Sequence, residues 1–345
     1  GHFPLITVKT LSLVNHTFWE RSQIYIDFII KHYILKSETG SIKSRGAENM
    51  FTDVKDSDVY DYRKSKEIKI GKYIRTEMAN DTSVKKSIRT SIGFIDIYIY
   101  YPKKQTTNAV YFNMHGGGMC LGYYQLDIPY CKLLVQNTGA IVVNIDYCLA
   151  PGYRFPLAYT TTYEVLKYCN ENRKEFGFGN SKFLIGGNSA GGEIAMGVIQ
   201  LEKKDHQDFI KGLILNYAPC DQKIKKQDVI DPKKAISPDR IHQYQAWEYN
   251  TIDEIQDPLS AAVNSDPRLY PDTLINSAEY DSLRAGEEQF AKQLKDVGVH
   301  VDYRCFKNCQ HGFTHKDLKE FNPDASKEAW QRIADFIVKI GKEDE

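Results

Sequence analysis

The chain has 345 residues, of which 45 are Lys or Arg and 45 are Asp or Glu, so its formal net charge is zero at neutral pH. This balance excludes the strong positive potential typical of proteins that bind nucleic acid or anionic membranes, and we expect neither as a partner. The length and the hydrophobic content of 42% suit one large folded domain with an added cap segment.

The N-terminal part, residues 1–66, differs in pattern from the rest of the chain. Over 18–34, apolar residues such as Phe18 and Ile24 recur at helical spacing, which predicts an amphipathic helix. Residues 40–67 are polar and rich in turn formers, which predicts a loop or linker.

Over residues 67–345, strand-like apolar runs alternate with helical patterns, which predicts an α/β domain with a mostly parallel sheet. The expected strands are 94–101, 109–114, 140–145, 182–185, 213–217, 273–278 and 299–306. The first alternates like an edge strand, whereas the continuous apolar runs further along are typical of strands buried on both faces. Helices are expected over 284–297 and around Trp330 and Ile337. The stretch 222–255 is too long for an ordinary loop and predicts a lid or binding insertion.

A serine lies between two glycines in Gly187-Asn188-Ser189-Ala190-Gly191, directly after an apolar run and before a helix-like run. The pattern predicts a sharp strand-to-helix turn, in which side chains at the glycine positions would collide with the neighbouring strand and helix. Such a turn exposes the hydroxyl beside the free N–H groups of a helix start, where an oxyanion is stabilised. A plain Gly/Ser-rich turn is the alternative.

A second glycine-rich segment, His115-Gly116-Gly117-Gly118, follows the strand expected over 109–114. Without side chains in the way, such a loop can turn backbone N–H groups toward a ligand. The alternatives are a flexible connector and a phosphate cradle. The cradle is disfavoured because the segment lacks the Lys-Ser/Thr ending of a P-loop.

These two segments resemble the markers of the hormone-sensitive-lipase-like family of α/β-hydrolases, an HGGG loop and a G-x-S-A-G-G elbow. Four further segments are similar to the family and follow its order, namely Tyr147–Pro151, Phe155–Ala158, Ala278–Arg284 and His311–Phe313. The resemblance runs from about residue 70 to the C-terminus. It implies an α/β-hydrolase fold, with helices on both sides of a central sheet and a helical cap, and carboxylesterase activity without a cofactor or metal.

The resemblance also implies a catalytic triad. Ser189 would be the nucleophile, His311 the general base and then the general acid, and Asp281 the carboxylate that orients the imidazole. The order Ser, Asp, His is typical of this fold. Asp281 could instead cap the following helix. His315 competes with His311 as the base, and we interpret it as a surface histidine.

The resemblance assigns the oxyanion hole to the backbone N–H groups of Gly117, Gly118 and Ala190, with His115 and Gly116 supporting the loop. Candidate pocket residues are Met119, Asn216, Tyr217, Tyr244 and Trp247. The N-terminal helix and the insertion would form a cap over the acyl pocket. The alternative is that the N-terminal helix and the insertion only pack on the surface of the domain, without covering the pocket.

Three departures from the family pattern stand out. Asn188 occupies a position where the family has Asp or Thr, and Cys148 and Gly152 replace a family Arg and Glu. Ala285-Gly286-Glu287 stands where the family has Asp-Glu-Gly, so we expect the carboxylate contacts beside the triad acid to be missing. None of these changes affects the triad or the oxyanion hole.

The cysteines number 7 and have neither zinc-ligand spacing nor a disulfide pattern, which predicts reduced, mostly buried thiols and a cytoplasmic protein. The chain begins Gly1-His2 rather than with methionine, which indicates a processed or tagged form. The apolar run over 5–14 is short and contains Lys9, so we expect no membrane span and a soluble protein.

The sequence therefore predicts a serine carboxylic-ester hydrolase that acts on small-molecule esters with short to medium acyl chains through an acyl-enzyme. An amidase or deacetylase acting on arylacetamides or acetylated sugars is the first alternative, because the same triad cleaves amides. A ligand-binding protein that has lost catalysis is the second. A monomer and a homodimer are both compatible with the pattern, since an edge strand over 299–306 could pair across a dimer.

Overall fold

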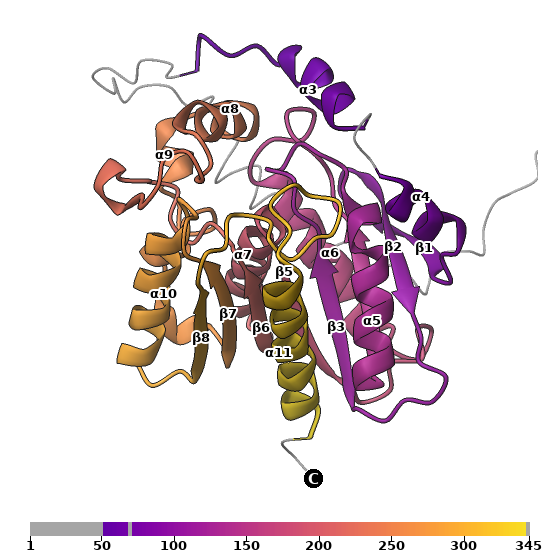
Figure 1. Ribbon diagram of the computed structural model, residues 1–345. Coiled ribbons are helices and arrows are strands. Elements are labelled where there is room, and N and C mark those ends of the chain that lie inside the picture. Colours follow the sequence, from indigo (N-terminus) through magenta and orange to yellow (C-terminus); the bar gives the residue numbers. More distant parts are fainter. Residues whose placement is uncertain (1–50, 68–70, 343–345) are drawn as a thin grey trace, which may run out of the picture. The chain divides into compact units, whose positions relative to one another are not determined.

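A computed structural model describes residues 51–67 and 71–342 (Figure 1). The amphipathic helix expected over 18–34 lies outside these residues, as does most of the segment 1–66. The described chain contains an eight-stranded sheet in the order β1-β2-β4-β3-β5-β6-β7-β8. Its strands are β1 (Val84–Thr90), β2 (Gly93–Tyr100), β3 (Ala109–Met114), β4 (Ile141–Asp146), β5 (Lys182–Asn188), β6 (Ile210–Asn216), β7 (Thr273–Ala278) and β8 (Val301–Phe306).

Helices cover both faces of this sheet, as the alternating pattern predicts. Helices α5 and α11 pack together on one face, and α6 and α7 pack together on the other, with α10 on the side of α7 (Figure 1). The described helices are α3 (Asp58–Glu67), α4 (Lys72–Ala79), α5 (Ile128–Thr138), α6 (Leu157–Glu171), α7 (Ala190–Lys204), α8 (Pro238–Glu248), α9 (Ile252–Ile255), α10 (Arg284–Asp296) and α11 (Pro323–Lys342). Strands β3 to β8 are parallel, so their carboxyl ends meet at one edge of the sheet.

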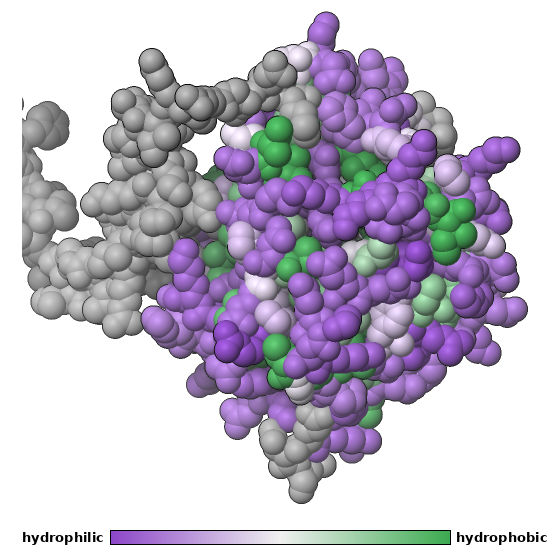
Figure 2. Space-filling model, turned by 90° about the vertical axis from the view of Figure 1, so that its left-hand side faces the viewer, coloured by the Kyte–Doolittle hydropathy of each residue, from purple (hydrophilic) through white to green (hydrophobic). Residues whose placement is uncertain are grey.

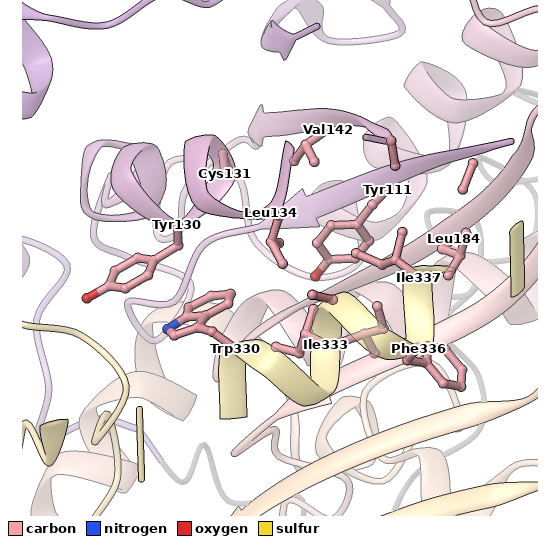
Figure 3. Packing of buried hydrophobic residues seen from close by; sticks show 14 of the residues in the cluster. Tyr111, Tyr130, Cys131, Leu134, Val142, Leu184, Trp330, Ile333, Phe336 and Ile337 are labelled. Atoms are coloured by element: carbon pink, nitrogen blue, oxygen red, sulfur yellow. The ribbon is translucent and has the colours of Figure 1, made fainter. Parts of the chain in front are cut away.

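The central strands are continuous apolar runs in the sequence because both faces of the sheet are buried. In β3, Tyr111 points into the cluster beneath α5 and α11, whereas Phe112 packs on Phe183 at the opposite face. On the first face Trp330 of α11 stacks on Tyr130 of α5, with ring centroids 4.5 Å apart (Figure 3). Successive side chains of a strand point to opposite faces, so a strand covered on both sides is apolar throughout.

The expectation that residues 94–101 form an edge strand is wrong. Strand β2 pairs with β1 on one side and with β4 on the other, both antiparallel, and β1 is the edge. Most side chains of β1 are exposed and two are lysines, so the strand resembles a loop in sequence. Charged residues on an edge strand disfavour pairing with a second sheet. The other expected edge strand, β8, does lie at the sheet edge.

The prediction of a loop or linker over 40–67 is wrong for its last ten residues, because 58–67 form helix α3. Only Val59 and Tyr62 are buried along it, which leaves almost no helical periodicity to detect. The guanidinium of Arg63 donates hydrogen bonds to the carbonyl oxygens of Cys120 and Ala150. Tertiary contacts therefore hold this polar helix.

The connection from β6 to β7 carries the insertion expected over 222–255. It contains α8 and α9, which lie beyond the carboxyl ends of the strands (Figure 1). On the α10 side of the molecule, hydrophobic residues form small separate groups on a mainly hydrophilic face (Figure 2). Ligand sites of parallel sheets lie at the carboxyl edge, which directs attention to the space between these ends and α8.

We expect Ile337→Ala to lower the free energy of unfolding by about 2 to 5 kcal/mol, because it leaves a cavity beneath α11. Ile337 is 0% exposed and belongs to the cluster in Figure 3. The measurement is urea unfolding followed by circular dichroism. Gln331→Ala, an exposed change on the same helix, should shift stability by less than about 0.5 kcal/mol. Equal effects of the two variants would contradict the described packing of α11.

Candidate active site

Ser189 lies on a strained turn between β5 and α7. Its backbone angles are φ 52° and ψ −123°, in the left-handed region that side chains rarely adopt. A Cβ atom at Gly187 would lie 2.4 Å from the carbonyl oxygen of Met114, and one at Gly191 would lie 2.1 Å from the same atom. Neither distance is possible for real atoms, so the steric reason for glycine at both positions is confirmed.

The three side chains named from the motifs converge at this turn. The Nε2 atom of His311 lies 2.9 Å from Ser189 Oγ, and its Nδ1 atom lies 2.6 Å from Asp281 Oδ2. With a proton on Nδ1, the imidazole donates to the carboxylate and accepts from the serine hydroxyl. Elements far apart in sequence therefore place a hydroxyl, an imidazole and a carboxylate in one line of hydrogen bonds.

Asp281 also bonds to the backbone nearby. Its Oδ1 atom accepts the N–H of Leu283 at 3.1 Å, while Oδ2 accepts from His311. Helix α10 begins at Arg284 with Leu283 in the capping position, so Asp281 is not the N-cap residue. The side chain is almost completely buried, and the backbone contact holds one carboxylate oxygen while the other faces the imidazole.

The glycine-rich loop runs beside the serine. A Cβ atom at Gly116 would lie 3.4 Å from Ser189 Cβ, and Gly117 and Gly118 have φ angles of 126° and 57°. Ala190 is the first residue of α7, so its N–H has no acceptor within the helix. The loop and the helix start thus bring backbone donors to the neighbourhood of the same hydroxyl.

His115, at the start of this loop, supports its backbone. Its ring is buried and stacks on Tyr147, with centroids 4.2 Å apart and an interplanar angle of 16°. The Nδ1 atom lies 2.7 Å from the carbonyl oxygen of Gly116, and the Tyr147 hydroxyl donates to the carbonyl oxygen of His115 at 2.9 Å. These contacts fix the backbone where the loop leaves β3.

A cavity of about 710 Å³ opens above Ser189 and His311. Of the pocket candidates, Met119, Tyr217 and Tyr244 line it. Asn216 and Trp247 do not, which corrects that part of the prediction. Trp247 is buried against α3 and its indole N–H donates to the carbonyl oxygen of Lys55. Asn216 is buried at the end of β6, and its side-chain amide donates to Asn188.

Helix α8 meets the glycine-rich loop and α3 at the edge of the cavity. A Cβ atom at Gly118 would lie 2.5 Å from the ring of Tyr244, so only glycine allows this contact. The hydroxyls of Tyr244 and Tyr62 are 2.6 Å apart, and the guanidinium of Arg240 lies 3.9 Å from the centroid of the Tyr62 ring. Aromatic side chains from two helices therefore cover this side of the cavity.

Two buried glutamates, Glu193 of α7 and Glu248 of α8, share another wall of the cavity. The Tyr159 hydroxyl lies within hydrogen-bond distance of both carboxylates, and it is 2.9 Å from that of Glu248. One hydroxyl proton serves only one acceptor, so the second contact requires a protonated carboxyl. Burial raises the pKa of Glu193 to about 7 and the pKa of Glu248 well above its usual value.

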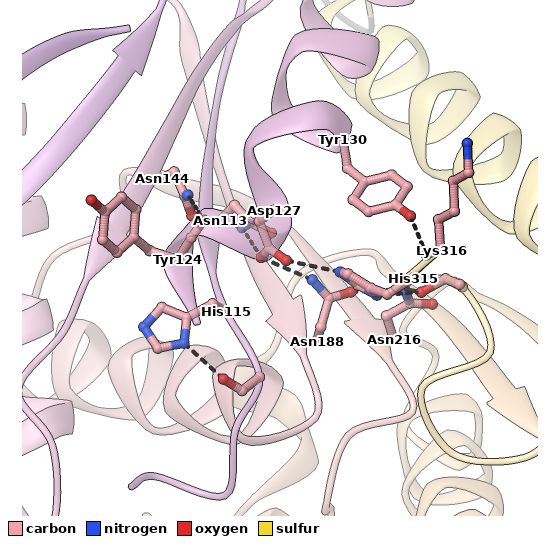
Figure 4. A network of polar contacts seen from close by, with 12 residues as sticks. Asn113, His115, Tyr124, Asp127, Tyr130, Asn144, Asn188, Asn216, His315 and Lys316 are labelled. Atoms are coloured by element: carbon pink, nitrogen blue, oxygen red, sulfur yellow. Dashed lines mark hydrogen bonds and ion pairs between the residues drawn. The ribbon is translucent and has the colours of Figure 1, made fainter. Parts of the chain in front are cut away.

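The interpretation of His315 as a surface histidine is wrong. The side chain is buried, and its Nε2 atom lies 2.8 Å from Oδ1 of Asp127 (Figure 4). Its Nδ1 atom lies 2.9 Å from the Tyr217 hydroxyl. Asp127 precedes α5 and was missed from the sequence because no motif or periodic pattern around it indicates a role. Its partner is far away in the sequence, and only the fold joins them.

One buried carboxyl, that of Glu287, nevertheless stands in the segment after Asp281. The buried carboxylate of Glu287 accepts the N–H of Ala218 at 2.9 Å and the hydroxyl of Ser277 at 2.5 Å. Burial raises its pKa well above the usual value, and the nearby charge of Asp281 adds to this. This carboxyl, at the third residue of the segment 285–287, therefore links α10 to β7 and to the residue after Tyr217.

All seven cysteines are unpaired, and all but Cys305 are buried. Within residues 51–67 and 71–342, no cluster of His, Cys, Asp and Glu side chains has the arrangement of a metal site. None of the helices in these two ranges is both long enough and apolar enough to span a bilayer.

The chain is similar to known esterases in sequence. A family model described as an α/β hydrolase fold matches residues 111–315. The versiconal hemiacetal acetate esterase of Dothistroma septosporum is 28% identical over 214 residues, which are 59% of this chain and 65% of that protein. Carboxylesterase NlhH of Mycobacterium tuberculosis is 29% identical over 231 residues, 64% of this chain and 72% of that protein.

Solved structures are similar as well. An esterase from Pyrobaculum calidifontis matches with a TM-score of 0.72 and 26% identity, and the match covers 84% of this chain and 94% of the other. The region that the family model matches contains the glycine-rich loop, the serine turn and the segments with Asp281 and His311. The chain therefore belongs to the hormone-sensitive-lipase-like family of α/β-hydrolases.

Proposed function

We propose that this protein is a serine carboxylic-ester hydrolase that works through an acyl-enzyme. The observation that carries the proposal is the line of hydrogen bonds from Ser189 through His311 to Asp281 at the floor of a cavity. The esterase names of its relatives support the same activity. Because the base and its carboxylate are both in place, a protein of this fold that only binds its ligand is disfavoured.

In the first half-reaction, His311 accepts the hydroxyl proton of Ser189 while Oγ attacks the ester carbonyl carbon. The carbonyl oxygen becomes an oxyanion that the N–H groups of Gly117, Gly118 and Ala190 stabilise, and losing one such donor costs about 3 to 4 kcal/mol. His311 then gives its proton to the leaving alcohol, the C–O bond breaks, and the acyl group remains on the serine.

In the second half-reaction, water takes the place of the alcohol. His311 removes a proton from the water, whose oxygen attacks the acyl carbonyl, and returns the proton to Ser189 as the acid leaves. Asp281 accepts the Nδ1 hydrogen throughout and stabilises the imidazolium that forms in each step. No cofactor or metal takes part in this sequence.

The cavity and its cover support small substrates with short to medium acyl chains. A volume of about 710 Å³ lies within the range of pockets for small ligands. Helix α8 of the insertion covers one side of it, so we assign the insertion a cap function. Comparing an aryl acetate with the matching acetanilide would separate an esterase from an amidase.

The unpaired thiols support a reducing compartment such as the cytoplasm.

The carboxyl pair of Glu193 and Glu248 would hold the cap to the catalytic core, because it joins the start of α7 to the end of α8. The Tyr249 hydroxyl, just after α8, also donates to Glu193 at 2.8 Å. This buried contact makes the attachment of the cap sensitive to protonation.

Ser189→Ala and His311→Ala should each lower kcat on p-nitrophenyl acetate by at least about 1,000-fold, since each removes a group that the chemical step requires. Wild-type protein should also be labelled at Ser189 by an organophosphate, and the alanine variant at position 189 should not be. The control is His300→Ala, an exposed histidine before β8. Normal turnover by the Ser189 variant would refute the proposed mechanism.

Tyr244→Ala should raise the ratio of kcat/KM for butyrate to that for acetate esters by about 10-fold, because it enlarges the cavity beside Gly118. Trp247→Phe is the matched control, since this aromatic residue of the same helix packs outside the cavity. An unchanged ratio across a panel of p-nitrophenyl esters would remove Tyr244 from the acyl or alcohol site.

The Glu193 pair predicts a dependence of stability on pH. The folded pKa of Glu193 is raised to about 7, above the value of about 4.3 for an unfolded glutamate. Between these values the folded protein keeps a proton that the unfolded chain releases, so the free energy of unfolding falls by about 1.4 kcal/mol per pH unit as pH rises. Below this range, both states are protonated and the contribution is constant.

Glu193→Gln should therefore reduce the decline in stability but not abolish it, since glutamine does not titrate, whereas burial still raises the pKa of Glu248. The measurement is urea unfolding at pH 5, 6 and 7. Glu171→Gln, at an exposed glutamate, should leave the slope unchanged. The same slope in wild type and in Glu193→Gln would show that the pair does not hold its proton.

A further inference from the structure

A buried carboxylate receives hydrogen bonds from three separate segments of the site. Asp127 ends the short helical turn Tyr124–Asp127 that follows the glycine-rich loop, and it is 2% exposed. Its Oδ1 atom accepts from His315 at 2.8 Å. Its Oδ2 atom accepts from the side-chain amides of Asn113 at 2.7 Å and Asn188 at 3.1 Å (Figure 4). One carboxylate thus joins the strand before the loop, the serine turn and the histidine loop.

The other end of His315 leads to the base. Its Nδ1 atom lies 2.9 Å from the hydroxyl of Tyr217, and the ring of Tyr217 packs edge-on against His311, with centroids 5.0 Å apart. Tyr217 is buried, has a positive φ of 42°, and also bonds Thr314 through its hydroxyl at 2.6 Å. The ring therefore has little freedom to move independently of His315.

We propose that Asp127 and His315 form a positioning pair that sets the placement of Ser189 relative to His311. On one side the pair acts through Asn188, the residue directly before the serine. On the other side it acts through Tyr217, which contacts the imidazole. Neither member of the pair touches the reacting atoms. The inference rests on the proposed function, since it assigns the pair a role in the same reaction.

A contribution to folding alone does not account for this arrangement. A buried polar contact of this kind adds little net stability compared with apolar residues of the same volume, although losing one partner is costly. Its distinctive property is geometry, because the three donors to the carboxylate come from three different segments of the chain. A nucleophile displaced by about 1 Å can lower the rate about 100-fold, so a contact that fixes two loops has a catalytic effect.

The test compares two substitutions at one position. His315→Leu removes the donor to Asp127, and we expect kcat on p-nitrophenyl acetate to fall by about 10- to 100-fold with KM nearly unchanged. His315→Gln keeps a side-chain N–H that can donate to Asp127, so its kcat should lie closer to wild type than to the leucine variant. The rate at which an organophosphate labels Ser189 should follow the same order.

The control is Glu202→Gln. This buried carboxylate accepts the N–H groups of Phe209 and Ile210 at the far end of α7. It should lower the urea midpoint without changing kcat, which separates stability from positioning. If His315→Leu is folded and less stable but keeps wild-type kcat and labelling rate, the pair is only structural and the proposal is wrong.

A leucine variant that does not fold would be replaced by Asp127→Asn, which keeps the volume of the side chain. The same loss of kcat at constant KM is expected, and wild-type kcat in folded Asp127→Asn would overturn the proposal. Failure of the proposed function is a distinct result. It would appear as activity in Ser189→Ala, whereas failure of the positioning role leaves that variant inactive.

Discussion

The close approach of two backbone segments is the constraint on which the rest of the site depends. The carbonyl oxygen of Met114, at the end of β3, would lie only 2.4 Å from a Cβ atom at Gly187 and 2.1 Å from one at Gly191. This contact holds the turn against β3, keeps Ser189 at a positive φ angle, and starts α7 directly after the serine. Because β3 continues into the glycine-rich loop, the same contact places the backbone of this loop beside Ser189.

Two buried polar clusters lie on different sides of this turn and differ in kind. In one cluster, Asp127 joins the amides of Asn113 and Asn188 to His315, within and next to the parallel strands. In the other, Glu193 meets Glu248 of the insertion through tyrosine hydroxyls. The first connects parts of the sheet region, whereas the second connects α7 to α8. Burial raises the pKa of both carboxyls in the second cluster, because two carboxylates at this depth cannot both be charged without a large cost.

Local patterns predicted much of the fold. The bounds of β3 and β7 agree with the expected ranges 109–114 and 273–278, since strands buried on both faces are apolar throughout. β1 and α3 were missed for the opposite reason. β1 is a lysine-bearing edge and α3 has only Val59 and Tyr62 buried, so neither carries a clear period. Their structure depends on partners distant in sequence, which a local pattern does not contain.

By itself the sequence determined the elements that need special local chemistry. Glycine at fixed positions around Ser189, and the short motifs with Asp281 and His311, are required by backbone sterics and by the reaction, so they can be recognised without coordinates. Only the tertiary structure decided which other polar residues meet at the site. The sequence predicted His315 as a surface residue and gave no role to Asp127. The two side chains meet because the loops that follow the carboxyl ends of the parallel strands lie close together. Hydrogen bonds between residues distant in the chain produce no periodic pattern in the sequence. Each polar side chain could equally be exposed to solvent or buried against a partner.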